Sequence, residues 1–430
     1  MTDVLSLLPP GRPGLLADVP PGACEDLAHY LATGGCAPLP APGRLVDRIA
    51  AAGLRGRGGA GFPTAVKLRT VRDAPGGPPV VVANGEEGEP GSVKDRWLLW
   101  HRPHLVLDGL RLAAAMTGAA RGYVYLSDDL AEHAVRQALA ERKVPAGRQA
   151  LALRQASAEW APEVPVDVVR TERTYVAGEE TAVVRRIDGG PALPTAKPPR
   201  PFESGVGGAP TLVANVETLA RIAALHTHPE SAAAIAGTHL VTLSGAGGTP
   251  ALVEAPAGTH LKTLADLSGH GRARAVVLGG LFGGLYGAGW SDLRLDHEEL
   301  AAAGGALGCG ALHFLHPDDC PVAAATDAAG WLAAQSARQC GVCVSGTSAL
   351  ARALTAVARG EADGTTVANL ERWSRQLPGR GACGLIDAAA RMVATLLTHY
   401  PERIEAHRSS PCPPCTAAPP ATHRYTVAVP

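Results

Sequence analysis

The stretch PVVVANGEEGEPGSVKDR, residues 79–96, carries the clearest indication of the fold. It begins with branched apolar residues that end at Asn84, a pattern typical of a buried strand. Residues 105–118, LVLDGLRLAAAMTG, then have the pattern of a helix, and residues 122–127, GYVYLS, that of another strand. This alternation predicts an α/β fold with mostly parallel strands.

The chain has 430 residues, which predicts two or three domains with an ample core. Its 39 basic and 40 acidic residues leave a net charge of -1. No bulk field therefore attracts it to nucleic acid or to anionic lipid, and we expect neither as a partner. Glycine (51) and proline (36) are abundant, which indicates many turns and close backbone approaches, or simply a GC-rich genome.

The first residues, MTDVLSLLPPGRPG, lack the basic region and apolar core of a secretory signal. The longest uncharged apolar run, residues 275–290, is shorter than the roughly 20 residues of a spanning helix. We expect a soluble cytoplasmic protein with no direct membrane insertion. In a reducing compartment its nine cysteines are expected to be thiols or ligands rather than disulfides.

The composition divides the chain into five predicted parts. Residues 1–50 form a leader with one or two helices, residues 51–236 the α/β domain, and residues 237–320 a small antiparallel β module with a connecting segment. Residues 321–406 have helical periodicity, and the apolar stripe within residues 384–397 predicts the core of a helical bundle. Residues 407–430 are rich in proline and are expected to be disordered.

The first candidate loop is GLRGRGGAGFPTAVKL, residues 53–68. Its glycines allow positive φ and a close approach of the backbone to a ligand. Arg57 and Lys67 add positive charge, and Pro63 predicts the start of a helix, whose N-terminus favours anions. A phosphate or a planar ring can lie against such a loop, although a flexible surface loop has the same composition. The loop has neither the dinucleotide fingerprint after a strand nor the GK[ST] of a P-loop.

The second loop follows the buried strand and contains Glu86, Glu87 and Glu89. Like charges this close repel one another and can raise one pKa. Solvated turn acids are the usual explanation for such a run. The loop leaves the carboxyl end of a strand, however, which is where α/β sheets bind ligands.

Two further motifs each place polar residues at the start of a predicted helix. In TYVAGEETA, residues 174–182, a short strand-like piece leads to Gly178 and to the paired acids Glu179 and Glu180. In VANVETLA, residues 213–220, Asn215 has the position of an N-cap. Capping and the helix dipole explain each motif when it is taken alone.

Together and in this order, the four motifs resemble the NADH-binding flavoprotein subunit of respiratory complex I. The same family includes the diaphorase subunits of NAD-linked hydrogenases and formate dehydrogenases. The resemblance implies a Rossmann-like FMN/NADH-binding domain, then a ubiquitin-like β-grasp domain and a C-terminal helical bundle. It implies an NAD(P)H-oxidising enzyme of the NADH dehydrogenase (quinone) or diaphorase type. Such an enzyme takes a hydride onto FMN and passes single electrons to an iron–sulfur cluster and then to a quinone-reductase, ferredoxin-type or other partner.

The resemblance also assigns site residues, position by position. The expected FMN contacts are Gly56, Arg57, Gly58, Lys67, Asn84, Glu86, Glu87, Tyr175, Gly178, Glu179, Glu180, Asn215 and Thr218. The expected contacts to NADH, or alternatively NADPH, are Phe62, Glu89, Glu180 and Lys197. Glu180 matches the residue that meets both flavin and nicotinamide, and Glu89 and Glu180 are the expected catalytic pair.

The chain departs from the family pattern at several of these positions. Glu86 replaces an aspartate, and Ala214 replaces the first residue of an asparagine pair. Thr70 and Arg200 replace two aromatic residues that clamp adenine in the family. Because stacking contributes roughly 0.5–1.5 kcal/mol per aromatic pair, nucleotide affinity should fall. Arg200 can stack on adenine or meet a 2′-phosphate, so we expect a relaxed or altered NADH/NADPH preference.

The stretch CGVCVSG, residues 340–346, matches the family's cluster motif CxxCxxC, which a fourth cysteine completes. Cys340, Cys343 and Cys383 match three of the four ligands of a [4Fe–4S] cluster, and Gly346 stands at the third position of the motif. Three outcomes stay open: a [4Fe–4S] cluster with an outside ligand or one from Cys412 or Cys415, a [3Fe–4S] cluster, or no cluster.

A zinc module built on the same cysteines is less favoured because it also lacks a fourth ligand. Simple burial is expected for the remaining cysteines, which are Cys24, Cys36, Cys309 and Cys320.

The resemblance implies a separate electron-accepting partner, either a thioredoxin-like [2Fe–2S] subunit or a ferredoxin. The protein would then be cytoplasmic or peripheral to a membrane complex. The alternative is a degenerate, non-catalytic structural subunit of an electron-transfer assembly. The replacements at Thr70, Arg200, Ala214 and Gly346 favour this alternative, whereas the retained glycines and acids favour flavin binding.

Overall fold

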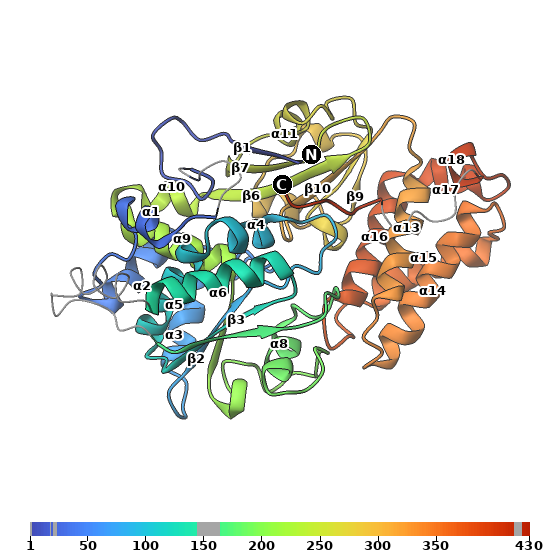
Figure 1. Cartoon of the computed structure of the whole chain (residues 1–430). Helices are drawn as coiled ribbons and strands as arrows, with labels where there is room; N and C mark the ends of the chain where they lie inside the picture. The colour runs from blue at the N-terminus through green and yellow to red at the C-terminus, as the bar shows by residue number, and fades with distance from the viewer. Residues whose placement is uncertain (1, 18, 20–23, 144–163, 417–423) are drawn as a thin grey trace.

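The structure is a computed structural model that describes residues 2–17, 19, 24–143, 164–416 and 424–430. It is a mixed α/β protein with two separate sheets, one of four strands and one of six. The helices of the C-terminal part lie together at one side of the two sheets (Figure 1).

The four-stranded sheet is parallel throughout, with the strand order β4-β3-β2-β5. Its strands are β2 (Val80–Asn84), β3 (Arg121–Leu126), β4 (Val166–Arg170) and β5 (Thr211–Asn215). The predicted strands 79–84 and 122–127 are thus confirmed as neighbours. The helices before β6 are α1 (Leu27–Ala32), α2 (Pro42–Ala51), α3 (Thr64–Arg72), α4 (Lys94–His101), α5 (Pro103–Thr117), α6 (Asp129–Lys143), α8 (Glu180–Ile187), α9 (Val216–Thr227) and α10 (Ala232–Ala236).

The apolar run of β2 follows from burial on both faces of this sheet. Val81 and Ala83 belong to the core cluster that α3, α5 and α9 cover. Val80 and Val82 belong to a smaller cluster on the other face, where Val183 of α8 packs. Because both faces are covered, alternate residues of β2 cannot be polar.

The strand order creates a switch point between β2 and β5. From β2, the chain continues to β3 on one side, whereas β5 is added on the other side. The last residues of these two strands, Asn84 and Asn215, are register partners. Ligands of open α/β sheets bind in the crevice that forms at such a point, outside the carboxyl ends of the strands.

The six-stranded sheet has the order β1-β7-β6-β10-β8-β9. Its strands are β1 (Asp3–Ser6), β6 (Thr238–Gly245), β7 (Ala251–Pro256), β8 (Ala275–Val277), β9 (Leu285–Tyr286) and β10 (Ala311–Leu315). Helices α11 (Leu261–Leu267) and α12 (His297–Ala302) belong to this part. The prediction of an antiparallel module is wrong for two strand pairs, because β6 and β10 are parallel and so are β1 and β7. The expected helical leader also begins with a strand, β1, which adds an edge to this distant sheet.

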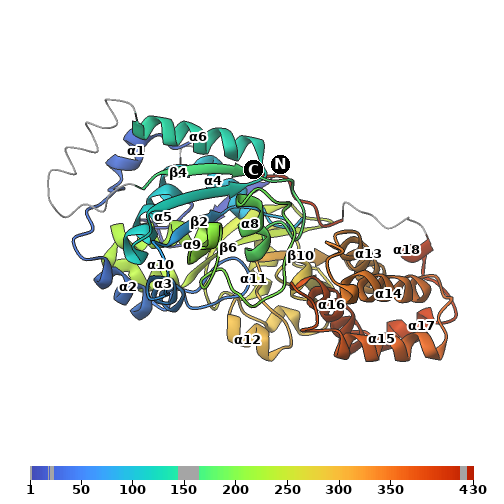
Figure 2. The ribbon, with the colours of Figure 1, turned by 90° about the horizontal axis from the view of Figure 1, so that it is seen from below.

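The C-terminal helices extend away from the sheets (Figure 2). They are α13 (Pro321–Ala334), α14 (Gly341–Ala358), α15 (Gly364–Gln376), α16 (Leu385–His399), α17 (Pro401–His407) and α18 (Pro413–Thr416). The predicted stripe of α16 is buried at Leu385, Ile386, Ala389, Met392, Val393 and Leu396, and Leu397 is half-buried. Among the described residues, α14 alone has the length and composition to cross a membrane, which a core helix of a soluble protein can also have.

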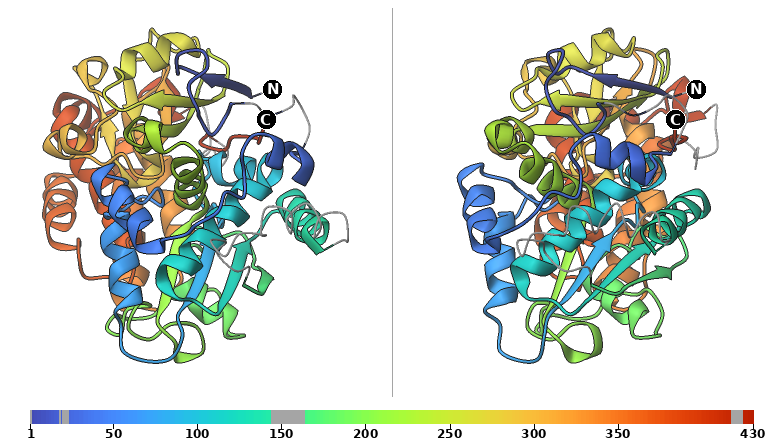
Figure 3. Two further views of the ribbon diagram at one scale, coloured as in Figure 1. Left: turned by 90° about the vertical axis from the view of Figure 1, so that its left-hand side faces the viewer. Right: turned by 60° about the vertical axis from the view of Figure 1, so that its left-hand side comes forward.

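The expected disorder of residues 407–430 is wrong where the structure describes them. Residues 407–416 include the end of α17 and all of α18. Tyr425 is buried and donates to the Ala324 carbonyl over 2.7 Å. Thr2 donates to the Ala428 carbonyl over 2.8 Å, so the two ends of the chain lie side by side (Figure 3). Residues 417–423 lie outside the described part of the chain.

Candidate functional site

Asn84 links the second and third motifs at the end of β2. Its amide nitrogen Nδ2 donates to the Gly178 carbonyl over 2.8 Å, and its Oδ1 accepts from the Glu86 N–H over 3.3 Å. A Cβ added at Gly178 would lie only 3.0 Å from the Glu86 carbonyl oxygen. The absence of a side chain at Gly178 therefore lets the two loops pack backbone to backbone.

Asn215 performs the corresponding role at the end of β5. Its Oδ1 caps α9 by accepting from the Glu217 N–H over 3.0 Å, as the sequence predicts. Its Nδ2 donates to Asp95 Oδ2 over 2.6 Å. Lys94 lies between these groups, 2.7 Å from Asp95 Oδ1 and 3.1 Å from Glu217 Oε2.

Lys94 and Asp95 are buried residues that the sequence analysis did not assign to the site. Although burial opposes the shift, the carboxylates of Asp95, Glu217 and Glu87 raise the pKa of Lys94, so its ammonium group is retained. Burial also opposes the shift of Glu217, yet Lys94 and the neighbouring arginines lower its pKa to about 2. In the sequence, the only indication of this ion pair was that Lys94 and Asp95 closely follow the three acids of the second loop.

The glycine loop reaches the same crevice. Gly58 is exposed, and a Cβ added there would lie 3.4 Å from Asn215 Cβ, at ordinary contact distance. The Arg57 N–H donates to Thr218 Oγ1 over 2.8 Å and so ties the loop to α9. Gly56 donates to the Phe62 carbonyl over 2.8 Å, which closes the loop on itself.

The Arg57 side chain is directed into the protein. Its guanidinium bonds to His239 and donates to the Ala236 carbonyl over 2.6 Å. Burial lowers the pKa of Arg57 to about 9. The guanidinium therefore already has partners within the core, and the flavin contact expected of Arg57 stays a prediction.

Two of the three acids in the second loop have carboxylate oxygens without a hydrogen-bond partner among the described residues. These atoms are both oxygens of Glu86 and Oε1 of Glu89. Burial raises the pKa of Glu86 to about 7, against the opposing effect of Ser127 and Arg173. Burial likewise raises the pKa of Glu89 to about 7, although its Oε2 accepts from the Leu281 N–H over 3.1 Å. Solvated turn acids are thus excluded as the explanation for this loop, and burial contributes more to the shifts than like-charge repulsion.

Glu87, in contrast, is fully engaged within the protein. It accepts from the Ser92 hydroxyl over 2.6 Å and from the Asp95 N–H over 3.1 Å. Arg96 Nε donates to its other oxygen over 3.1 Å. Despite burial, Arg96 and Lys94 lower the pKa of Glu87, so this carboxylate stays ionised and stabilises the first turn of α4.

The third motif contributes acidic side chains to a row in which positive and negative charges alternate. Glu179 caps α8, and residues 175–178 form turns instead of the expected strand-like piece. Lys197 Nζ lies 2.7 Å from Glu179 Oε1 and 3.2 Å from Glu180 Oε1. Lys67 Nζ lies 3.8 Å from the other oxygen of Glu180 and donates to the Val213 carbonyl over 2.7 Å. Glu180 is therefore held between two lysines, one from the glycine loop's helix and one from the Pro-rich segment.

Of the residues expected to contact the nucleotide, Glu180 and Lys197 belong to this charged row, Glu89 is buried, and Phe62 is open to solvent. The Phe62 ring is 52% exposed, and Arg200 is exposed. A surface cavity of about 360 Å³ lies between α8 and the Pro-rich segment, with a lining that includes Thr181, Ala196 and Pro199. Thr70 bonds only to the Val66 carbonyl of its own helix in the described structure, over 2.9 Å.

Tyr175 connects this region with the helical part. Its N–H donates to Gln335 Oε1 over 3.1 Å, and its ring meets the Trp331 ring edge-on at 5.4 Å. Burial raises the pKa of Tyr175, and the nearby Glu89 and Cys383 add to the shift. The phenol is therefore close enough to an acid of the second loop and to one of the candidate cluster cysteines for both to affect its pKa.

The three candidate cluster cysteines lie together at the starts of two helices. Cys340 is the N-cap of α14, Cys343 is in its first turn, and Cys383 precedes α16. The Cys343 thiol is close enough to both of the others for them to raise its pKa. A Cβ at Gly346 would lie 3.1 Å from Ile386 Cδ1 and 3.3 Å from Leu377 Cδ1, so apolar side chains fill the place of the third motif cysteine.

These arrangements can be tested against the cofactors that the resemblance implies. Unpaired, buried carboxylate oxygens and an exposed glycine beside Asn215 fit a polar, planar ligand at the switch point. Three neighbouring thiols fit three of the ligands of an iron–sulfur cluster. Both sets of residues are compatible with their groups, although the cluster set is one protein ligand short of four.

The fold and site thus define a flavoprotein with a flavin region and an iron–sulfur region, and comparisons with known proteins identify both. Residues 49–224 match the family described as Nuo51 FMN-binding domain. Residues 323–407 match the NADH-ubiquinone oxidoreductase-F iron-sulfur binding region. The chain belongs to the family of the F subunits of NADH-quinone oxidoreductases, which confirms the recognition from the sequence, the oxidoreductase class and the expected cofactor regions.

The relatives extend over most of the chain. The F 2 subunit of the NADH-quinone oxidoreductase of Rhizobium meliloti (strain 1021) is 31% identical over 411 residues, which cover 91% of this chain and 96% of the relative. NADP-reducing hydrogenase subunit HndC of Solidesulfovibrio fructosivorans is 29% identical, with 87% and 79% covered. A solved chain of an air-oxidised NAD⁺-reducing [NiFe]-hydrogenase matches with a TM-score of 0.75 and 28% identity, over 90% of this chain and 67% of that one.

Proposed function

We propose that this protein is the NADH-oxidising flavoprotein subunit of an electron-transfer assembly, with FMN at the switch point of the four-stranded sheet. The observation that carries the proposal is the group of unpaired carboxylate oxygens beside the Asn84–Asn215 pair. Bound FMN would accept a hydride from the nucleotide and release the electrons one at a time. Glu86 and Glu89 supply hydrogen-bond partners in a buried setting, where such bonds are strong.

The residues around the crevice have distinct proposed roles. Gly58 gives the flavin a flat approach to Asn215, and Thr218 holds the loop through the Arg57 N–H. Glu180 is the residue best placed to orient the nicotinamide, because Lys67 and Lys197 fix its carboxylate from two sides. Lys197 and the exposed Phe62 belong to the nucleotide side, and Glu89 is the second candidate catalytic acid.

Tyr175 and the three cysteines form the proposed exit for electrons. Tyr175 is electrostatically coupled to both Glu89 and Cys383 and packs on Trp331 of α13, so we place it between the crevice and the helical part. Cys340, Cys343 and Cys383 would hold an iron–sulfur cluster with three protein thiolates. A cluster of this kind passes single electrons to a separate partner, which we propose is a thioredoxin-like [2Fe–2S] subunit or a ferredoxin.

We propose three working parts with the boundaries that the sequence suggests. Residues 51–236 form a Rossmann-like cofactor domain, residues 237–320 a β-grasp-like domain, and residues 321–406 the iron–sulfur bundle. The protein would act in the cytoplasm, either free or as a peripheral subunit of a larger complex.

The test is the colour of the full chain and its response to nucleotide. After anaerobic purification and reconstitution with FMN, we expect a yellow protein whose flavin absorbance bleaches on addition of NADH. A protein that stays colourless, or a yellow protein that no nicotinamide nucleotide bleaches, would contradict the proposal and favour the structural-subunit alternative. The variant Lys197→Met should bleach at a higher NADH concentration while FMN content stays the same, because Lys197 lies on the nucleotide side.

A further inference from the structure

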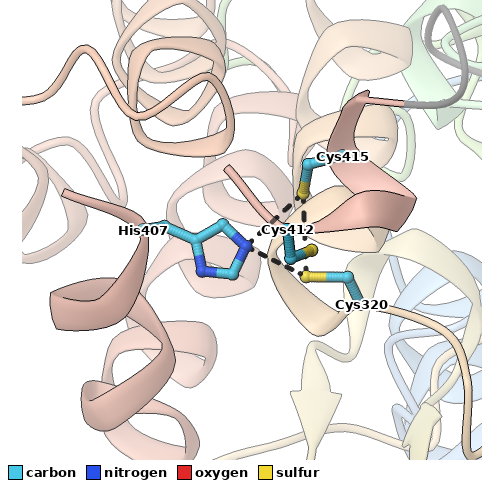
Figure 4. Close-up of side chains that lie close together, drawn as sticks. All are labelled: Cys320, His407, Cys412 and Cys415. Atoms are coloured by element: carbon cyan, nitrogen blue, oxygen red, sulfur yellow. Dashed lines mark hydrogen bonds between the residues drawn. The ribbon is translucent and has the colours of Figure 1, made fainter. Parts of the chain in front are cut away.

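A second group of metal-binding side chains lies apart from the candidate cluster. Cys320, His407, Cys412 and Cys415 direct their ligand atoms toward one another, and these four atoms all lie within 4.8 Å of each other (Figure 4). Cys320 caps α13, His407 is the last residue of α17, and the other two cysteines lie at α18. Cys320 and His407 are buried, and Cys412 and Cys415 are half-buried.

We propose that these residues form a mononuclear zinc site with three thiolates and one imidazole. Tetrahedral zinc with Zn–S of about 2.3 Å and Zn–N of about 2.0–2.1 Å requires edges of about 3.8 Å between sulfurs and about 3.5 Å between nitrogen and sulfur. The Cys320 and Cys415 sulfurs are 3.7 Å apart. His407 Nε2 lies 3.5 Å from the Cys320 sulfur and 3.6 Å from the Cys415 sulfur. Three edges of the expected tetrahedron are therefore present.

The imidazole of His407 is oriented for this role. Its Nδ1 lies 2.7 Å from the Arg403 carbonyl oxygen, which can only accept a hydrogen bond. Nδ1 must therefore carry the proton, and the lone pair is on Nε2, the atom that faces the cysteines. A backbone carbonyl that fixes the tautomer in this way is a typical outer partner of a metal-bound histidine.

The distances distinguish this site from other uses of cysteine. A disulfide requires an S–S distance of about 2.05 Å, far below the observed 3.7 Å. In a cubane cluster each cysteine binds a different iron atom, so the cluster holds its ligand sulfurs farther apart than a single metal ion does. Four protein ligands also leave no open position, which indicates a structural rather than a catalytic site.

The two cysteine groups lie at opposite ends of α13. Cys320 precedes this helix of 14 residues, and Cys340 follows it. At 1.5 Å per residue, the helix separates the two groups by about 21 Å. Cys412 and Cys415 therefore cannot complete the cluster, as one expectation from the sequence allowed. Cys320 is buried as expected, but burial alone does not explain its position, since its sulfur faces three other ligand atoms.

The site joins segments that are distant in sequence. Zinc there would fasten α17 and α18 to the beginning of α13, close to the point where the chain leaves β10. Arg424 adds ion pairs in the same region, at 3.3 Å to Asp319, which precedes α13, and at 2.9 Å to Asp327 on that helix. Because metal binding to such a set contributes directly to folding free energy, the zinc would hold the end of the bundle in place.

Metal analysis of the tag-free full chain, purified anaerobically, tests the proposal. We expect close to one zinc per chain in addition to any iron. The double variant Cys412→Ser/Cys415→Ser should lose zinc at least tenfold and keep its iron. The matched control, Cys340→Ser/Cys343→Ser, should lose iron and keep zinc. Wild-type protein without zinc, or a Cys412→Ser/Cys415→Ser variant that loses iron instead, would overturn the assignment.

A measurement on the unmodified protein covers the case in which the variants do not fold. X-ray absorption at the zinc edge should give three sulfur neighbours at about 2.3 Å and one nitrogen at about 2.0–2.1 Å. A first shell of oxygen and nitrogen would mean surface-bound zinc and would refute the site. Cobalt(II) in place of zinc should give the visible absorption of a tetrahedral thiolate complex, and its absence would refute the site equally.

Discussion

Asn84 and Asn215 are register partners at the carboxyl ends of two parallel strands, and each fastens a different set of loops. Asn84 holds Gly178 of the third motif, whereas Asn215 holds Asp95 and the first turn of α9. Four motifs that are spread over more than 130 residues therefore meet at one crevice. The switch point of the sheet explains why they occur together in one chain.

Gly58 gives a direct test of flavin binding at this crevice. The variant Gly58→Ala should fold normally, because among the described residues its Cβ meets only Asn215, at 3.4 Å, and Gly58 is not in the positive-φ region. A ring lying against the loop would lose its flat contact, so we expect FMN affinity to fall by at least roughly tenfold, or about 1.4 kcal/mol. The measurement is FMN titration of the apoprotein by fluorescence quenching.

The control is Gly43→Ala, a change on α2 where an added Cβ has no neighbour within 4 Å in the described structure. It should leave FMN affinity unchanged. Equal affinities for Gly58→Ala and Gly43→Ala would show that the flavin does not lie over this glycine.

The pKa of Glu86 predicts how the FMN-free protein responds to pH. Burial raises this pKa from 4.5 to about 7. Below about pH 4.5 the carboxyl is protonated in both the folded and unfolded states. Between about pH 4.5 and 7 the unfolded state ionises first, so the free energy of unfolding falls as pH rises, by at most about 3 kcal/mol. Glu86→Gln should remove the part of this fall that Glu86 contributes, whereas Glu89, whose pKa burial also raises to about 7, keeps its own part, as measured by denaturant unfolding at about pH 5 and about pH 8.

The matched control is Glu87→Gln, one residue away in the same loop. Arg96 and Lys94 lower the pKa of Glu87 despite burial. The substitution should therefore destabilise the protein at neutral pH, with the opposite sign to Glu86→Gln. If both variants destabilise equally at about pH 8, Glu86 has a partner in solution that the structure does not describe.

The sequence allowed the parallel sheet and its ligand edge to be predicted because the signals are local. The apolar run of residues 79–84 requires cover on both faces, and Asn215 caps the helix that it immediately precedes. Contacts between distant segments were not predictable in this way. Strand β1 pairs with β7, which lies almost 250 residues later in the sequence. Cys320 likewise finds its partners more than 80 residues further along the chain.

The directions in which side chains point could not be predicted from the sequence either. Arg57 has the charge and position of an anion ligand, but its guanidinium is drawn into the core by Glu217, His239 and the Ala236 carbonyl. The three acids of the second loop look alike in sequence, yet Glu87 is paired, whereas the oxygens of Glu86 have no hydrogen-bond partner in the described part of the chain. The difference depends on where α4 places Arg96, which only the folded chain determines.

Arg200 is expected to alter nucleotide preference. The resemblance implies an aromatic residue at this position, Arg200 is exposed, and its neighbours Pro199 and Pro201 line the surface cavity. A guanidinium can bind a 2′-phosphate through two hydrogen bonds. Arg200→Gln should therefore raise the KM for NADPH several-fold more than the KM for NADH, in steady-state assays with an artificial acceptor. Arg359→Gln, at the C-terminal end of α14, is the control, and strict NADH use by the wild-type protein would refute the prediction.

Gly346 decides whether a full cysteine set can be restored. Ile386 and Leu377 lie within 3.1–3.3 Å of the place where a Cβ would stand. Gly346→Cys therefore overpacks the bundle, at a cost of about 1–3 kcal/mol. We expect the single variant to be less stable than wild type, as measured by thermal unfolding of the apoprotein.

Truncating Leu377 should relieve this contact and allow the new thiol to act as a ligand. We expect Gly346→Cys/Leu377→Ala to bind more iron per chain than wild type after anaerobic reconstitution, with the spectrum of a four-cysteine cluster. Gly346→Ala/Leu377→Ala is the matched control, because it has the same packing change without the thiol. Equal iron in both double variants would show that position 346 does not reach the cluster, and that the three existing thiolates are its full protein ligand set.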